Sequence, residues 1–165
     1  MTAGRDNEPM PAKNPTTVER VSDRELVVTR TFDAPARLVF QAWTTAELFK
    51  RWWAPKSMGV PLRSCEMDVR VGGGYRLVFG HADAEPMAFF GRYLEVAPPS
   101  RLVWTNEESP DGAVTTVTFE ERDGKTLLVL TELYPSKEAF DASSGGMDLA
   151  AEQFVQLDAL LLTLG

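Results

Sequence analysis

A long stretch of strand-like sequence between residues 62 and 134 constrains the fold of this chain more than any other feature. Apolar and polar side chains alternate there with a period of two, which is typical of strands with one buried face. The predicted strands are 62–71, 75–79, 87–96, 101–106, 114–121 and 126–134. Only short segments with turn residues, such as Gly72-Gly73-Gly74 and Asp123-Gly124, separate them. Because a parallel connection needs a dozen or more residues, neighbouring strands must be antiparallel.

Helices are predicted on both sides of this stretch. Residues 25–32 form one further strand, and Asp33-Ala34-Pro35 then begins a short helix, because proline suits the first helical turn. Thr45 is expected to cap a second short helix, which ends before Pro55. Near the C-terminus an apolar stripe recurs at helical spacing. It consists of Met147, Ala150, Ala151, Phe154, Leu157, Leu161 and Leu164.

This order of elements predicts an α+β fold. The long C-terminal helix must bury its apolar stripe, and a curved antiparallel sheet offers the surface for it. A curved sheet also leaves space beneath such a helix, so we expect a cavity between the sheet and the C-terminal helix. Residues 1–20 hold three prolines and few apolar side chains, which predicts a flexible lead-in. Residues 21–165 are expected to form a single domain.

The charge balance argues against several classes of partner. The chain has 17 Lys and Arg against 24 Asp and Glu, a net charge of −7, and its basic residues form no dense cluster. Because phosphate backbones and anionic lipids attract basic surfaces, we expect no nucleic-acid and no membrane partner. Cys65 is the only cysteine, and the first 20 residues hold no apolar signal-peptide core. These features predict a cytoplasmic protein.

Several motifs resemble those of a known family. They are Asp33-Ala34-Pro35, Val39-Phe40-Gln41-Ala42-Trp43, Trp52-Trp53, Asp68-Val69-Arg70-Val71-Gly72-Gly73, Gly91-Arg92-Tyr93-Leu94-Glu95-Val96 and Pro98-Pro99-Ser100-Arg101-Leu102-Val103-Trp104-Thr105. In this order, over residues 24–164, the chain resembles the family of the activator of the ninety-kilodalton heat-shock chaperone's ATPase. That family belongs to the START-like, polyketide-cyclase-like (SRPBCC) superfamily.

The resemblance implies a helix-grip (START-like) fold, with a curved antiparallel sheet, two short helices and a long C-terminal helix. For function it implies a range, from lipid carriers and hormone receptors to aromatic cyclases and chaperone activators. The chain departs from its bacterial relatives at Gln153-Phe154, where they often have a tryptophan on the last helix.

Residues that bind metals or act as nucleophiles are scarce. His81 is the only histidine and Cys65 the only cysteine, so the sequence predicts no metal site, no cofactor and no catalytic residue. A Cys65–His81 pair is an alternative to a buried thiol and a solvated loop histidine. Gly72-Gly73-Gly74 precedes a strand rather than a helix, which favours a hairpin turn over a phosphate-binding loop.

Glu132 is the carboxylate best suited to a binding site. It shares a predicted strand face with Leu128, Leu130 and Tyr134, and a buried carboxylate needs a partner or a raised pKa. We therefore expect Glu132 to orient the polar end of a ligand, with Arg70 as a second candidate for this role. Asp68 is a weaker choice, because an ion pair with Arg70 on the same strand face would also explain it.

Aromatic residues are the strongest local sign of a binding site. The chain holds four tryptophans, and its rings come from the short helices, the sheet and the last helix. Such rings either line a cavity or fill the core, and both alternatives stay open at this stage. The predicted ligand-binding residues are Trp43, Phe49, Trp52, Phe79, Tyr93, Trp104, Glu132 and Phe154.

Three functions fit these observations. The favoured one is non-catalytic binding of a small apolar or aromatic molecule between the sheet and the C-terminal helix. The second is a chaperone-associated or stress-response module that contacts a protein through an exterior patch. The third is a cyclase- or hydrolase-like enzyme with Glu132 or Asp68 as general base. The chain is expected to be a monomer or a homodimer.

Overall fold

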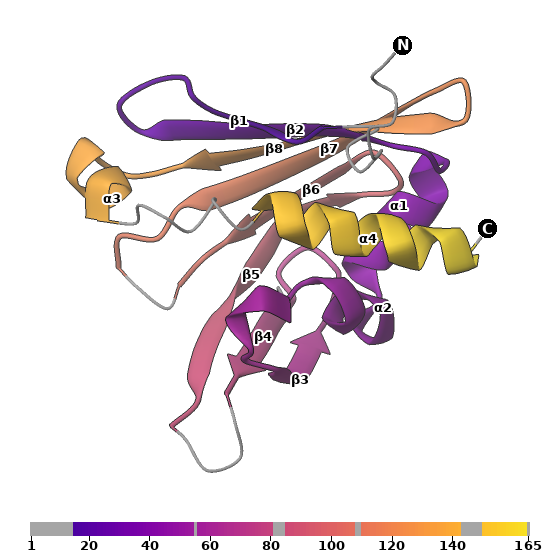
Figure 1. Ribbon diagram of the computed structural model, residues 1–165. Coiled ribbons are helices and arrows are strands. Elements are labelled where there is room, and N and C mark those ends of the chain that lie inside the picture. Colours follow the sequence, from indigo (N-terminus) through magenta and orange to yellow (C-terminus); the bar gives the residue numbers. More distant parts are fainter. Residues whose placement is uncertain (1–14, 55, 81–84, 108–109, 143–149, 165) are drawn as a thin grey trace.

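In a computed structural model the chain is described over residues 15–54, 56–80, 85–107, 110–142 and 150–164. These residues form one curved sheet, with α1, α2 and α4 gathered on one face of it (Figure 1). The strands are β1 (Thr17–Arg20), β2 (Glu25–Phe32), β3 (Leu62–Met67), β4 (Gly74–Phe79), β5 (Met87–Ala97), β6 (Arg101–Thr105), β7 (Val114–Arg122) and β8 (Lys125–Leu133). The helices are α1 (Ala36–Thr44), α2 (Ala46–Trp52), the 3₁₀ turn η1 (Lys56–Met58), α3 (Lys137–Ala142) and α4 (Ala150–Leu164).

The sheet has the strand order β1-β2-β8-β7-β6-β5-β4-β3, and each neighbouring pair is antiparallel. Strands β3 to β8 therefore form the predicted meander. Strand β2 joins it at β8, through pairs such as Val28 with Leu130. This topology, with the long helix α4 across one face, confirms the predicted α+β helix-grip fold (Figure 1).

The N-terminal boundary differs from the prediction at one point. Thr17–Arg20 lies inside the expected flexible lead-in, yet it forms the edge strand β1 and pairs with β2. All four side chains of β1 are exposed, so no buried face marks this strand in the sequence. Its backbone hydrogen bonds to β2 hold it in place. The first 14 residues of the predicted lead-in lie outside the described residues.

Strand β3 ends at Met67, four residues before its predicted end at Val71. The backbone N–H of Asp68 donates to the Gly74 carbonyl at 2.9 Å, and that of Gly73 donates to Arg70 at 2.8 Å. A Cβ atom on Gly73 would lie 2.1 Å from the Asp68 carbonyl oxygen, so the loop requires glycine there. The glycine run therefore joins β3 to β4 as the predicted hairpin turn.

Helix α1 begins at Ala36 directly after Pro35, as predicted, and Pro35 rather than Asp33 is its N-cap residue. Asp33 instead pairs with Lys125, at 3.6 Å between carboxylate and ammonium. The backbone N–H of Ala36 donates to the carboxylate of Glu121 at 2.9 Å. An acceptor with negative charge stabilises the free N–H groups of a helix N-terminus. Glu121 thereby anchors α1 to the β7–β8 hairpin.

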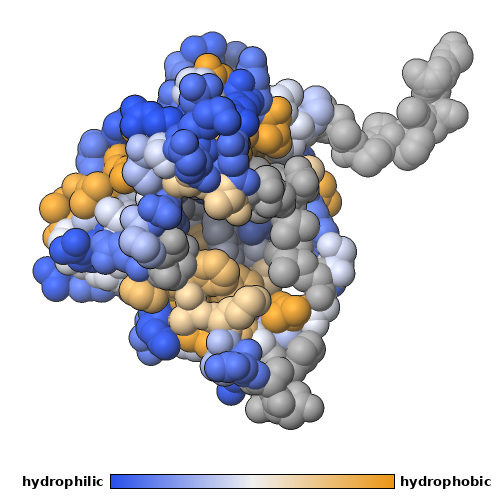
Figure 2. All heavy atoms as spheres, turned by 90° about the vertical axis from the view of Figure 1, so that its left-hand side faces the viewer, coloured by the Kyte–Doolittle hydropathy of each residue, from blue (hydrophilic) through white to orange (hydrophobic). Residues whose placement is uncertain are grey.

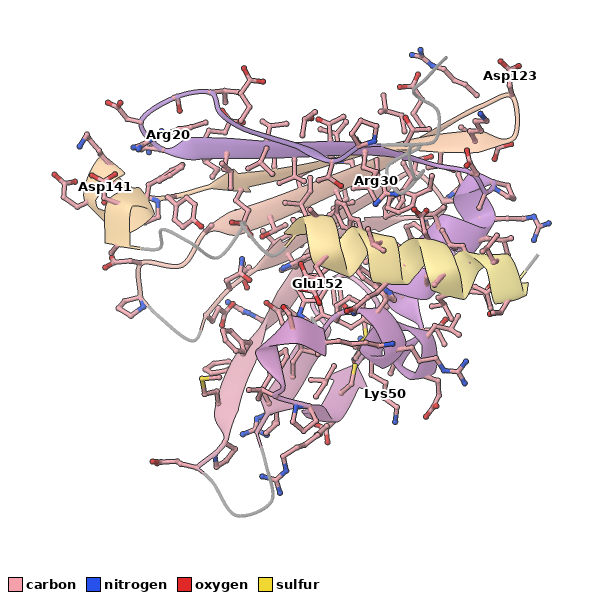
Figure 3. All side chains as sticks on the ribbon, in the orientation of Figure 1. Arg20, Arg30, Lys50, Asp123, Asp141 and Glu152 are labelled. Atoms are coloured by element: carbon pink, nitrogen blue, oxygen red, sulfur yellow. The ribbon has the colours of Figure 1, made fainter. Side chains whose placement is uncertain are left out.

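Helix α4 packs its apolar face on the sheet, with Phe154 and Leu157 at most 1% exposed. An ion pair also joins it to β2: Arg30, which is 4% exposed, pairs with Asp158. Figure 3 shows Arg30 between the sheet and α4. The sequence analysis did not select Arg30, because a charged residue interrupts the apolar pattern of its strand. No described helix is long and apolar enough to cross a membrane.

Candidate ligand-binding cavity

A cavity of about 270 Å³ lies between the sheet, the short helices and the start of α4. We call it the main cavity. Figure 2 shows this side of the molecule hollowed, with hydrophobic residues gathered below the hollow. Among the described residues, those that line it are Trp43, Phe49, Trp53, Met67, Tyr75, Leu77, Phe79, Met87, Phe89, Tyr93, Trp104, Asn106 and Gln153.

The alternation of β4 and β5 supplies one wall of the main cavity. Tyr75, Leu77 and Phe79 project from one face of β4, because side chains two residues apart share a face. On the neighbouring strand, Met87 and Phe89 line the same cavity. Their side chains are 49% and 38% exposed, so the cavity reaches the molecular surface beside them.

Aromatic rings from the helices and from β6 form the opposite wall. The ring of Trp43 lies 5.9 Å from those of both Trp53 and Trp104. Phe49 stacks on Trp53 with 4.7 Å between ring centroids. Aromatic pairs with this geometry stabilise each other by about 1 kcal/mol beyond the effect of burial. Because the rings pack against one another, the wall is formed without a ligand.

Polar side chains at the start of α4 hold the segment that follows α2. The side-chain amide of Gln153 donates to the Trp53 carbonyl at 2.6 Å. The carboxylate of Glu152 accepts from the backbone N–H of Ser57 at 2.9 Å and also from its hydroxyl. Hydrogen bonds from the Ser57 side chain and backbone lower the pKa of Glu152. Figure 3 places Glu152 on α4 above the shorter helices. These bonds fix Trp53 in the cavity wall.

The structure brings five of the eight predicted site residues together in the main cavity. They are Trp43, Phe49, Phe79, Tyr93 and Trp104. Trp52 lies in neither of the two cavities described here. Its ring is 0% exposed, and its indole N–H donates to the Ala42 carbonyl at 3.0 Å within the core. Trp53, which directly follows the last residue of α2, lines the main cavity in place of Trp52.

Glu132 and Phe154, the remaining two predicted residues, line a second cavity of about 60 Å³, the minor cavity. The alternation predicted for β8 is correct, since Leu128 and Leu130 on the same face are 0% and 4% exposed. Glu132 is half-buried and accepts a hydrogen bond from the Tyr134 hydroxyl at 2.9 Å. The minor cavity also contacts Trp53, Trp104, Asn106 and Gln153, so the two cavities share these four residues.

Asp68 forms the ion pair with Arg70 that was the alternative to a role in a binding site. Its carboxylate lies 2.9 Å from Nε of Arg70, and both side chains are largely exposed. Neither residue lines the main or the minor cavity. The geometry therefore supports a surface ion pair rather than a general base in a binding site.

Asn106 is a polar wall residue that the sequence analysis did not select. Its amide nitrogen donates to the Ala113 carbonyl at 2.7 Å and to the Thr115 hydroxyl at 2.9 Å. Its amide oxygen accepts from the Tyr75 hydroxyl at 3.2 Å. A signal was available, because Asn106 follows Trp104 by two residues at the end of a predicted strand and so shares its face.

The Tyr93 hydroxyl and the Cys65 thiol are uncharged at neutral pH. Burial raises the pKa of the Tyr93 hydroxyl above its usual range and raises the pKa of Cys65 to about 11. Cys65 is therefore a thiol rather than an activated nucleophile. Its suggested partner His81 lies outside the described residues. Within the described residues no three His, Cys, Asp or Glu side chains converge on one point.

The fold and the family follow from comparison with known proteins. Residues 33–160 match the family described as activator of Hsp90 ATPase homolog 1-like protein. The chain belongs to this family. The match confirms the resemblance noted in the sequence. No curated protein matches the chain.

Solved bacterial structures share the fold over most of the chain. A protein from Rhodobacter sphaeroides is 24% identical, with a TM-score of 0.81 over 91% of this chain and 99% of that one. One from Mycobacterium smegmatis is 25% identical, with a TM-score of 0.76 over 89% and 97%. One from Chromobacterium violaceum is 26% identical, with a TM-score of 0.71 over 85% and 98%. The helix-grip architecture is therefore common to this chain and these proteins.

Proposed function

We propose that this protein binds a small apolar or aromatic molecule in the main cavity and does not transform it. One observation carries the proposal: in a cavity that reaches the surface, no wall residue among the described ones carries a charged side chain. Of these 13 described wall residues, only Asn106 and Gln153 carry amides, and the others are aromatic, aliphatic or methionine. Ligand sites are mostly apolar with a few placed polar groups.

The volume of the main cavity limits the size of the ligand. A dry protein cavity of about 150 Å³ accommodates benzene. The main cavity, at about 270 Å³, has room for two fused rings. We therefore expect molecules of about the size of naphthalene to bind, and larger ones to extend through the mouth beside Met87 and Phe89.

The chemistry of the wall favours binding over catalysis. A general base must reach the proton that it removes, yet within the described part of the chain no main-cavity wall residue carries a carboxylate or an imidazole. Glu132 lies at the minor cavity, where it is bonded to Tyr134. Burial keeps Tyr93 protonated, so its hydroxyl serves as a hydrogen-bonding group rather than as a base.

Calorimetric titration with 2-naphthol, a two-ring probe, tests this proposal. Leu77 is 5% exposed and faces the main cavity, so Leu77→Trp should fill it and weaken 2-naphthol binding at least about tenfold. Leu94 lies on the next strand, is 50% exposed and lines neither cavity, so Leu94→Trp is the matched control. Equal affinities in the two variants would reject the cavity as the binding site.

Native mass spectrometry of freshly purified protein provides an independent test. A bound molecule would add a discrete mass that disappears when the protein is denatured. In Leu77→Trp this added mass should be lost, because the ring occupies the space of the ligand. An added mass that persists in Leu77→Trp would contradict the proposal.

A second candidate function is contact with a chaperone of the Hsp90 type, which the family description suggests. Two large apolar side chains on the outer side of β5 favour it: Phe90 is 41% exposed and Leu94 is 50% exposed. Exposed apolar groups of this kind occur at protein contacts. Leu94→Asp should then weaken binding to a purified chaperone while 2-naphthol affinity stays unchanged. Chaperone binding that does not respond to Leu94→Asp would reject this surface.

A further inference from the structure

Hydrogen bonds at both ends of the Asn106 amide fix its orientation. Both hydrogens of the amide nitrogen are used, one by the Ala113 carbonyl and one by the Thr115 hydroxyl. The single hydrogen of the Tyr75 hydroxyl is shared between the Thr105 carbonyl, at 2.7 Å, and the Asn106 amide oxygen, at 3.2 Å. A rotated amide would face the Ala113 carbonyl with its oxygen, so the observed orientation is strongly preferred.

This orientation directs the two ends of the amide toward different cavities. Asn106 lines both of them, whereas Thr115 lines only the minor cavity and Tyr75 only the main cavity. The amide nitrogen is bonded on the Thr115 side, and the amide oxygen on the Tyr75 side. The oxygen is therefore the part of Asn106 that a molecule in the main cavity would meet. A carbonyl oxygen has two lone pairs, so it has capacity for a second donor.

The surroundings make this oxygen selective. A carbonyl oxygen repels a carboxylate or another acceptor and attracts an O–H or N–H group. Trp53 and Trp104 line both cavities together with Asn106, so aromatic rings border the same space. A hydrogen bond formed where water is excluded discriminates strongly against molecules that cannot make it.

We propose that the amide oxygen of Asn106 selects ligands that carry a hydrogen-bond donor, a hydroxyl or an N–H group, on an otherwise apolar ring system. This inference rests on the proposed function of the main cavity and specifies its ligand class. It assigns the polar anchor of the main cavity to Asn106 rather than to Glu132. A carboxylate or a ligand with acceptors alone is disfavoured at this position.

A comparison of two probes of similar shape tests the inference. The first, 2-naphthol, carries a hydroxyl donor, and the second, 2-methylnaphthalene, carries a methyl group in its place. Each is titrated into the wild type and into Asn106→Leu. Differences in probe hydration cancel when the affinity ratio of the two probes is compared between the two proteins. We expect the ratio of 2-naphthol to 2-methylnaphthalene affinity to fall about fivefold in Asn106→Leu, the usual effect of one lost hydrogen bond.

Met67→Leu is the matched control. Met67 lines the main cavity but offers no strong acceptor, so this volume-conserving change should affect both probes equally. A probe ratio that changes as much in Met67→Leu as in Asn106→Leu would overturn the inference. So would a ratio unchanged in Asn106→Leu while both probes bind, although cavity binding itself would then stand. Failure of both probes to bind the wild type would overturn the proposed function together with the inference.

A measurement on the wild type covers the case in which Asn106→Leu does not fold. The ¹³C resonance of the Asn106 amide carbonyl should shift on addition of 2-naphthol, because its oxygen accepts a new hydrogen bond. With 2-methylnaphthalene at equal saturation the shift should be much smaller. Equal shifts with the two probes would overturn the inference.

Discussion

The two halves of the sheet use similar residues in different ways. In the packed half, formed by β2, β7 and β8, Val28, Phe32 and Leu128 are all 0% exposed. The ring of Phe32 lies 5.4 Å from that of Phe154 on α4, in an edge-to-face contact. In the hollow half, formed by β3, β4 and β5, side chains such as Met87 and Phe89 line the main cavity and remain partly exposed. The packed half therefore forms part of the hydrophobic core, whereas the hollow half forms part of the cavity wall.

The placement of the helices accounts for this difference. Helix α1 packs on β7 and β8, whereas α2 packs on the edge strand β3. The side chains of β4 and β5 therefore face the main cavity, and rings of α1 and α2 lie on its other side. Protein interiors are otherwise packed as densely as organic crystals, and a gap of this size is consistent with the ligand site proposed above. An aromatic side chain on the inner face of the sheet therefore belongs to the core where a helix packs directly on it, and to the cavity wall where a gap lies opposite.

Truncating one ring in each half should give the largest difference in the free energy of unfolding. Phe32→Ala should lower the free energy of unfolding by about 3–5 kcal/mol, because it removes a fully buried ring. Phe89→Ala should lower it by less than about 1 kcal/mol, since that ring is partly exposed and borders empty space. Urea denaturation followed by circular dichroism measures both. Similar losses in the two variants would show that the hollow half is packed as tightly as the core.

Replacing one leucine by tryptophan in each half provides a second comparison. Leu128→Trp in the packed half should cost about 1–3 kcal/mol, because no space exists for the larger ring. Leu77→Trp in the hollow half should change the free energy of unfolding by less than about 1 kcal/mol, since the added atoms enter the main cavity. Thermal melts of both variants test this. A Leu77→Trp protein as unstable as Leu128→Trp would contradict the existence of that space.

The smallest effect concerns the bonds that hold Trp53 in the cavity wall. Because Ser57 lowers the pKa of Glu152 below its ordinary value of 4.5, their hydrogen bonds stabilise the fold above about pH 4.5. This contribution is lost as the pH falls through the lowered pKa. Glu152→Gln should therefore melt slightly below the wild type at pH 7, and the difference should shrink toward pH 3.

Glu138→Gln, a change of an exposed residue on α3, is the matched control for that pH series. It should melt like the wild type throughout. A melting difference between Glu152→Gln and the wild type that stays constant from pH 7 to pH 3 would show that the Glu152 charge does not stabilise the fold.

Much of the fold could be predicted because its signals are local. Short turns and two-residue periodicity specified the meander, and helical spacing specified α4. Tyr93 and Trp104, which the sequence analysis expected to bind a ligand, both line the main cavity. What escaped prediction lacks a local signal: β1 has no buried side chain, and Arg30 finds its partner Asp158 on a distant helix.

The sequence by itself determined which residues alternate, where the chain turns and that neighbouring strands run antiparallel. It took the tertiary structure to show that the rings of Trp43 and Trp104 border a cavity, that Trp53 rather than Trp52 joins them, and that Asn106 lines this cavity with its amide oxygen near the Tyr75 hydroxyl. The physical reason is the distance along the chain over which each feature is determined. Alternation depends on backbone geometry within one segment, whereas a cavity depends on the curvature of the sheet and on helices that contact it from distant parts of the chain.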